Sequence, residues 1–240
     1  MSTEPVDRQL ALCRKEFIRL SREVSRKGIS SAALETCRTT LVEQREKQWY
    51  IKSLAYQPTG LALGCPLPNI RDQKLFFHAA RLIGKWVQGG DDPACPAFAH
   101  VPPESFHITI VNRSHYQFNE IVSLTVDERN AIQAVVARLN IKRISVVTSG
   151  ILLTHTGRIF IKCLPLDDNI FHLRALLAES FPLLRTNIPR LVHIKIGHLL
   201  TPIEDRDLPG FVSWLERLGN HIIARLDFTD LFTPAGRIEL

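Results

Sequence analysis

Two short stretches decide the fold of this chain: FHITI at residues 106–110 and VHIKI at residues 192–196. In both, apolar residues alternate with polar ones, which predicts a strand with one buried face. Because successive side chains of a strand point to opposite faces, the polar residues of each stretch share one side. Each strand therefore presents a histidine and a second polar residue, two positions apart, to the same side. These pairs are His107 with Thr109 and His193 with Lys195.

The two histidines indicate acid–base chemistry if their strands lie side by side. Histidine titrates near neutral pH, so one imidazole can accept a proton while the other donates one. The Thr109 hydroxyl and the Lys195 ammonium group can hold the oxygens of an anionic group between them. This set suits in-line displacement at phosphorus without a metal ion. A single histidine in a strand is most often structural, but the repeat of the pattern 86 positions later (193 − 107) favours a functional pair.

The chain from residue 54 onward predicts an α+β fold in which strands and helices interleave. Apolar residues on one helical face predict a helix over 75–86, and a second helix starts at Thr125, with Glu128 completing a capping box. The stretch 89–104 contains several prolines and glycines and predicts a loop. The other expected elements are a strand within 60–68, a hairpin over 143–165 that turns at 155–157, a helix over 167–181, a strand over 189–200, a helix around 211–218 and a final strand over 221–232.

The N-terminal part of the chain predicts a helical extension to this fold. Apolar residues recur at helical spacing among charged ones, and Gly28 separates a first segment from a second that is expected to end near Trp49. A turn-like stretch, YQPTG at 56–60, follows. We therefore divide the chain into an extension, 1–53, and a domain, 54–240.

Composition and charge exclude several classes of protein. The chain has 240 residues, of which 45% are hydrophobic and 22% charged, so it can bury a large core and is not a disordered protein. Its net charge is +6, and the first 52 residues contribute +4 of it, with 11 Lys and Arg against 7 Asp and Glu. That basic arm can help to hold a polyanion.

The sequence also predicts where the protein is found. It contains no apolar run long enough for a membrane span and no apolar segment behind a basic start that would indicate a secretion signal. The five cysteines form no CxxC pair, which is typical of reduced thiols. We expect a cytoplasmic protein without membrane contact.

Other site chemistries find no support in the sequence. Motifs of the HExxH, GxSxG and GxxxxGK[ST] types do not occur. His193 and His198 are five positions apart on one predicted strand, so we expect them to face opposite sides. The sequence thus predicts neither a metal site nor a cofactor.

Further residues are candidates for substrate binding. Arg158, Phe160 and Lys162 alternate along the predicted strand 157–165, so that Phe160 can stack on a base while the two cations hold flanking phosphates. The alternative is a solvated sheet face. Beyond the first motif, a loop that overhangs the site can supply two more side chains, although an ordinary polar turn is the slightly favoured explanation of them. These two residues are Arg113 and Tyr116.

The paired motifs resemble those of the two-histidine (2H) phosphoesterase superfamily, which includes 2′-5′ RNA ligase-like proteins and cyclic phosphodiesterases. That family carries two H-x-[T/S]-x motifs at roughly this interval. The first often follows a proline-containing loop, as VPPESFHITI does at 101–110, and the second often continues into a glycine, as HIKIGHL does at 193–199. The resemblance covers about residues 54–232. It implies a bilobal α+β fold of two pseudo-symmetric lobes of antiparallel-rich sheet, with helices packed outside and a central cleft lined by the motif residues.

The resemblance also implies a function. It predicts a metal-independent phosphoesterase acting on RNA ends or small nucleotides, which opens a 2′,3′-cyclic phosphate or cleaves a 2′-5′ phosphodiester with His107 and His193 as the acid–base pair. Thr109 and Lys195 would hold the phosphoryl oxygens. Lys195 departs from the family pattern of Thr or Ser, and its charge favours a neutral His193, hence His193 as the base and His107 as the acid.

Two other functions stay open at this stage. Because Lys195 replaces a hydroxyl residue, the chain can be a weakly active or inactive nucleotide- or RNA-binding module that keeps the same cleft. The extension 1–53 can also be a docking helix pair for a protein partner.

Overall fold

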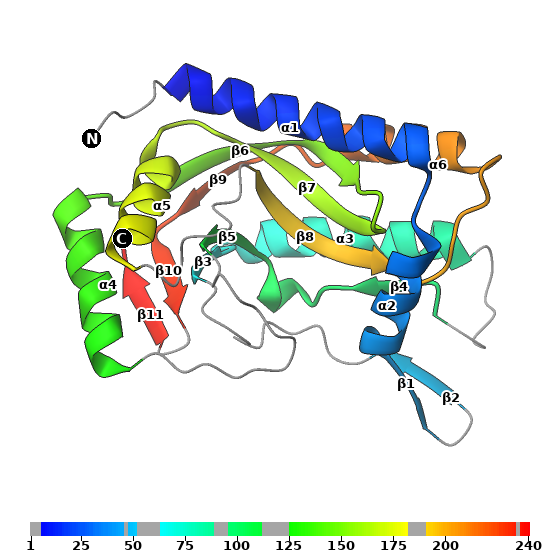
Figure 1. Cartoon of the computed structure of the whole chain (residues 1–240), viewed down its shortest axis with the longest axis horizontal. Helices are drawn as coiled ribbons and strands as arrows, with labels where there is room; N and C mark the ends of the chain where they lie inside the picture. The colour runs from blue at the N-terminus through cyan, green and yellow to red at the C-terminus, as the bar shows by residue number, and fades with distance from the viewer. Residues whose placement is uncertain are drawn as a thin grey trace.

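A computed structural model of the chain describes residues 6–45, 48–51, 63–88, 96–111, 125–181, 191–233 and 236–240 (Figure 1). The helices are α1 (Val6–Lys27), α2 (Ser31–Leu41), α3 (Ile70–Gln88), the 3-10 turn η1 (Pro103–Ser105), α4 (Val126–Leu139), α5 (Asn169–Ser180) and α6 (Leu208–Asn220). The strands are β1 (Val42–Arg45), β2 (Gln48–Ile51), β3 (Leu63–Pro66), β4 (Phe98–His100), β5 (His107–Val111), β6 (Ile144–Leu153), β7 (Arg158–Pro165), β8 (Val192–Leu199), β9 (Arg225–Phe228), β10 (Asp230–Thr233) and β11 (Gly236–Glu239).

One large antiparallel sheet organises the described part of the chain. Its strands follow the order β11-β10-β3-β5-β8-β7-β6-β9, and β4 pairs with β8 outside this path. The order divides into two halves of four strands, which meet where β5 pairs with β8. The predicted fold class, α+β with an antiparallel-rich sheet, is confirmed.

The apolar residues of the two motif strands form the centre of the main core. Ile108 of β5 and Ile194 of β8 are both fully buried and occupy the paired position that joins the two halves. Helices α3 and α6 pack against the same core and against each other through Trp86 and Phe211, whose rings lie 4.5 Å apart. The alternation read from the sequence therefore places the polar residues of both motifs on the opposite face.

Helix α1 lies on that opposite face. It runs along β6 and β7 (Figure 1), and its Cys13 and Phe17 form a separate apolar cluster with Leu152 of β6 and Phe160 of β7. Helix α2 follows after Gly28 and packs through Leu41 near the end of β8. The described helices of the extension, α1 and α2, are thus part of the packed structure.

Three expectations about secondary structure are wrong in detail. The second helix of the extension does not continue to Trp49. It ends at Leu41, because Val42 adopts an extended conformation and begins the β1–β2 hairpin. The stretch 89–104 is not wholly a loop, since it holds β4 and η1.

The last expected strand is three strands. β9 pairs with β6 in one half of the sheet, whereas β10 pairs with β3 in the other and forms a hairpin with β11. Because the chain crosses from one half to the other between β9 and β10, the segment cannot be a single strand.

Gly197 allows β4 to lie against β8. It pairs with His100, and a Cβ atom at this position would overlap the ring of Phe98 and lie 2.8 Å from the carbonyl oxygen of Ala99. The backbone of β4 and its aromatic side chain therefore occupy the space that any larger residue would need.

We expect Gly197→Ala to lower the free energy of unfolding by about 1–3 kcal/mol, because the added methyl group overpacks the β4–β8 contact. Urea denaturation measures the change. Gly210→Ala is the matched control, since a Cβ at Gly210 meets nothing within 4 Å, and this variant should be unchanged or slightly more stable. Equal stability of Gly197→Ala and the wild type would contradict the packing described.

Within the described residues, no helix is both long and apolar enough to cross a membrane.

Candidate active site

The pairing of β5 with β8 brings the four motif residues to one face of the sheet. Ile108 is paired with Ile194 in antiparallel register, so the positions on either side of this pair also lie next to each other. His107 is therefore beside Lys195, and Thr109 is beside His193. All four are partly exposed, whereas the apolar residues between them are buried.

Strand β7 extends this polar face on the other side of β8. Phe160 pairs with Lys195 and Lys162 pairs with His193. Paired residues point to the same side of a sheet, so Phe160 and Lys162 share the face of the motif residues. Arg158, two positions earlier, lies at its exposed end.

A β-bulge adds a residue to this face that the sequence pattern places elsewhere. The register between β7 and β8 shifts between Ile159 and Phe160, and Arg158 then pairs with His198. The extra residue in β8 reverses the alternation. His198 therefore lies on the same side as His193 and Lys195, and the expectation that His193 and His198 face opposite sides is wrong. Among the described residues, no three histidine, cysteine or acidic side chains cluster closely enough to hold a metal ion.

The proline-rich loop before β5 orients His107. η1 closes with the amide of Phe106 donating to the carbonyl oxygen of Pro103, and the turn presents the carbonyl oxygen of Ser105 at 2.8 Å from His107 Nδ1. A carbonyl oxygen can only accept, so Nδ1 carries the proton and Nε2 is the unprotonated nitrogen of the neutral ring.

His193 is held by packing. Its ring lies 4.1 Å from the ring of Phe160, centroid to centroid, and its buried Nδ1 atom has no hydrogen-bond partner among the residues that the structure describes. The two histidines thus differ: a carbonyl group fixes the tautomer of His107, whereas nothing of that kind fixes the tautomer of His193.

Burial and positive charge favour the neutral form of the histidines. Burial is the largest cause that lowers the pKa of His193 to about 3, followed by Arg174, His107 and Lys195. Burial also lowers the pKa of His107, against the opposing effect of its hydrogen bond to Ser105. The predicted influence of Lys195 on the pKa of His193 is therefore present, but burial and Arg174 contribute more.

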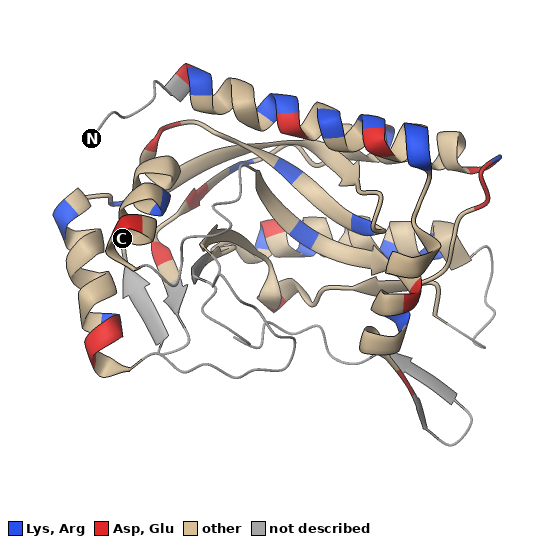
Figure 2. Cartoon of the chain, in the orientation of Figure 1, with Lys and Arg blue, Asp and Glu red and all other residues tan. Residues whose placement is uncertain are grey.

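The polar face is rich in cations. Strands β7 and β8 contain Arg158, Lys162 and Lys195, and none of β5, β7 and β8 contains Asp or Glu. Figure 2 marks basic residues along β7 and β8. Burial and the nearby Arg158 lower the pKa of Lys195. Burial also lowers the pKa of Lys162, although Glu216 of α6 opposes this. Such a group of positive charges favours the binding of an anion.

The N-terminal helices cover part of the site. Phe160 is only 7% exposed, because Cys13 and Phe17 of α1 pack against it. At the end of β8, Cys37 of α2 lies with its Sγ atom 3.7 Å from His198 Nδ1. Phe160 can therefore stack on a nucleotide base only if α1 moves away from it.

A buried arginine on α5 joins the two motif strands. Arg174 is 1% exposed. Its Nη2 donates to the carbonyl oxygens of Thr109 at 2.7 Å and Leu191 at 3.3 Å, and its Nε donates to that of Ile110 at 3.0 Å. The guanidinium group thus binds the end of β5 and the residue that precedes β8.

Sequence reasoning placed most of these residues but missed two. Arg174 is four positions after Ile170 and three before Leu177, both fully buried, so a charged residue on the apolar stripe of α5 was the available signal. His198 has no such signal beyond the preceding Gly197. Two predicted residues, Arg113 and Tyr116, lie outside the described part of the chain.

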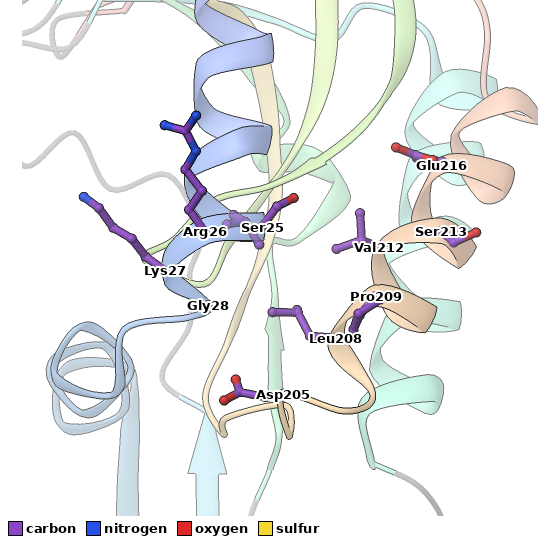
Figure 3. A pocket seen from close by; sticks show the side chains of 11 residues that line it. Ser25, Arg26, Lys27, Gly28, Asp205, Leu208, Pro209, Val212, Ser213 and Glu216 are labelled. Carbon is purple, nitrogen blue, oxygen red and sulfur yellow. The ribbon is translucent and has the colours of Figure 1, made fainter.

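A pocket of about 650 Å³ lies away from this face. The last turn of α1 and the first turns of α6 line it, together with Asp205 (Figure 3). None of the predicted site residues is among its lining residues.

Comparisons with known proteins give likeness in structure only. No protein-family model matches the sequence, and no curated protein matches it. The structure is similar to a conserved protein of unknown function from Agrobacterium tumefaciens, ATU0111, at 12% identity, with a TM-score of 0.44, over 75% of this chain and 84% of that one. It is also similar to Usb1 of Kluyveromyces marxianus, at 12% identity and a TM-score of 0.44, over 76% of this chain and 98% of that one. A structure of the same Usb1 with uridine monophosphate matches at 11% identity and a TM-score of 0.44, over 75% and 97% of the two chains.

The buried histidines predict that acid destabilises the protein. Burial lowers the pKa of His193 and of His198 to about 3 from an ordinary value of 6.5. Between these values the unfolded chain binds more protons than the folded one, so the free energy of unfolding falls as the pH drops below 6.5, by up to about 1.4 kcal/mol per pH unit for each histidine. Urea denaturation at pH 7 and pH 5 measures this loss.

The free energy of unfolding of the wild type differs between pH 7 and pH 5. The variant His198→Gln should make this difference about 2 kcal/mol smaller, since it removes one of the two histidines. His221→Gln, at an exposed histidine, is the control and should keep the wild-type difference. An unchanged pH dependence in His198→Gln would contradict the burial described.

Proposed function

We propose that this chain is a metal-independent phosphoesterase of the two-histidine type that acts on RNA ends or small nucleotides. The observation that carries the proposal is the placement of His107 and His193 on one face of adjacent antiparallel strands, with Thr109 and Lys195 beside them. Both histidines belong to motifs that resemble those of the 2H phosphoesterases. The reaction we propose is the opening of a 2′,3′-cyclic phosphate or the cleavage of a 2′-5′ phosphodiester.

The proposed reaction is an in-line displacement at phosphorus. Neutral His193 takes a proton from water while the water oxygen forms a bond to phosphorus. The bond from phosphorus to the leaving ribose oxygen breaks, and protonated His107 donates its Nε2 proton to that oxygen. Thr109 and Lys195 hold the two non-bridging oxygens as negative charge builds on them. A later proton exchange with water returns both histidines to their starting forms.

The hydrogen bonds support this division of roles. The bond from His107 Nδ1 to Ser105 stabilises the protonated ring, because it raises the pKa of His107. His193 has no such bond at Nδ1 within the described residues, and the charge of Arg174 lowers its pKa. An anionic phosphodiester between the two rings raises both pKa values. His107 therefore gains its proton as substrate binds, and His193 stays neutral as the base.

The substrate class follows from the cations around the histidines. Lys195 lies within the motif face, and Arg158 marks its exposed end. A nucleotide with one phosphate at the histidines can place a neighbouring phosphate near Arg158. The Phe160 ring is the aromatic surface available for a base, although α1 covers it in this conformation.

A binding module without turnover is the second candidate function. Two observations favour it: Lys195 stands where the family has a hydroxyl residue, and α1 covers the aromatic surface at Phe160. In this reading the cations retain a nucleotide or RNA end but the reaction does not follow.

Hydrolysis of 2′,3′-cyclic nucleotides and of short RNAs with cyclic-phosphate or 2′-5′ ends, with EDTA present, tests the enzyme. We expect His107→Ala and His193→Ala each to lower kcat by at least about 10²-fold, because each removes one proton transfer. His221→Ala is the matched control and should retain wild-type turnover. Circular dichroism confirms that the variants are folded.

Turnover that survives in both folded histidine variants would show that the assignment is wrong. Absence of turnover in the wild type on every substrate, combined with nucleotide binding, would favour the binding module.

Lys195→Thr separates the two candidate functions. If the chain is an enzyme, this variant should bind nucleotide about tenfold more weakly or more, because an ammonium group beside the phosphate is lost. If the chain is a binding module, the restored hydroxyl should create turnover that the wild type lacks. Equilibrium titration with a labelled nucleotide and the hydrolysis assay measure both quantities.

A further inference from the structure

We propose that Arg174 is the positioning residue of the two-histidine site: its guanidinium group ties the end of β5 to the start of β8 and holds a fixed positive charge beside His193. The catalytic part of this inference rests on the proposed function, but the geometric part can be tested without any substrate.

The pairing between the two motif strands is short, which makes another connection necessary. Only Ile108 and Ile194 are paired in the described residues of β5 and β8, whereas β7 and β8 are paired at six positions. Beyond the His107 end, β4 pairs with β8 at three positions, so the strands can splay or rotate only at the end where Thr109 and His193 lie. The separation between His107 and His193 would change with any such motion.

Arg174 supplies the missing connection. One atom, Nη2, donates to Thr109 of β5 and to Leu191 at the entry to β8, and Nε donates to Ile110. Thr109 and His193 lie at this end of the strand pair. The guanidinium group therefore fixes the end of the pair at which the proposed base and a proposed phosphate-binding hydroxyl meet.

The choice of arginine follows from its shape. The guanidinium group is planar, carries five N–H donors in a fixed fork and stays charged when buried. Burial lowers the pKa of Arg174 to about 10, so the group remains protonated at neutral pH. Lysine has a single nitrogen on a flexible stem and cannot reach three carbonyl oxygens in this geometry.

The charge of Arg174 acts on His193 directly. After burial, it is the largest cause of the low pKa of His193. A neutral His193 is the form that accepts a proton. Arg174 thus has two effects on the same residue, one on the position of its strand and one on its protonation.

The experiment uses the full chain with two variants. Arg174→Lys keeps the positive charge but loses the forked hydrogen-bond donors of the guanidinium group, and Arg174→Met loses both. We expect Arg174→Met to raise the pKa of His193, because a neighbouring positive charge is removed, measured by NMR titration of the ring proton signals. Arg174→Lys should keep the low pKa but increase hydrogen exchange at the amides of Thr109 and Ile194 about tenfold or more. In the hydrolysis assay both variants should lose roughly 10²-fold in kcat, as expected for a misplaced catalytic group.

Leu177→Ala is the matched control. It removes a fully buried side chain from the same helix and lowers stability by leaving a cavity, without touching the strands' carbonyl groups. It should leave the pKa of His193 unchanged, so a loss of stability alone cannot imitate the expected result. If Arg174→Met does not fold, the exchange rates in Arg174→Lys still decide the geometric claim.

Two outcomes overturn the inference. A pKa of His193 that is unchanged in folded Arg174→Met overturns the role of the charge, and wild-type exchange rates in Arg174→Lys overturn the role of the fork. Neither readout requires turnover. The pKa of His193 and the exchange rates can both behave as expected while His107→Ala and His193→Ala have no effect on hydrolysis. In that case the positioning role of Arg174 is supported and the proposed function is wrong.

Discussion

The site depends on one narrow contact, the antiparallel meeting of β5 and β8 through Ile108 and Ile194. Everything on the polar face takes its position from this pair, because strand alternation carries the buried isoleucines to one side and the motif residues to the other. A strand pairing of only one position contributes little stability by itself. Its neighbours strengthen it: the core holds both isoleucines from one side, and Arg174 binds the backbone of both strands at one end.

The same strands show how irregular backbone enlarges a site. Regular alternation would give β8 two polar residues on the functional face, but the bulge opposite Ile159 and Phe160 adds His198. The glycine that precedes His198 lets β4 approach at that point. Regular alternation would turn His198 away from the motif residues. The bulge instead places it near Lys195, where Cys37 of α2 contacts it.

Sequence patterns predicted the parts of this protein that follow local rules. The two motif strands, the capping box at Thr125 and the hairpin between β6 and β7 are settled by alternation, capping and turn chemistry within a few residues. Other features depend on partners far away in the sequence, which no local pattern encodes. These are the crossing between β9 and β10, the bulge in β8 and the hydrogen bonds of Arg174 to the motif strands. The amphipathic pattern of α1 predicted a helix with an apolar face, but not that Phe160 would be its partner.

The cover formed by α1 and α2 has a consequence for how the protein is made. These helices are synthesised before the strands that they cover, and their contacts lie more than a hundred residues later: the carbonyl oxygen of Gly28 accepts from His155 across 127 positions, and Cys37 meets His198 across 161. During synthesis their apolar faces therefore have no partner until β6, β7 and β8 have emerged. The newly made chain therefore exposes the hydrophobic side of α1 until these later strands have been made, which is the kind of surface that chaperones bind.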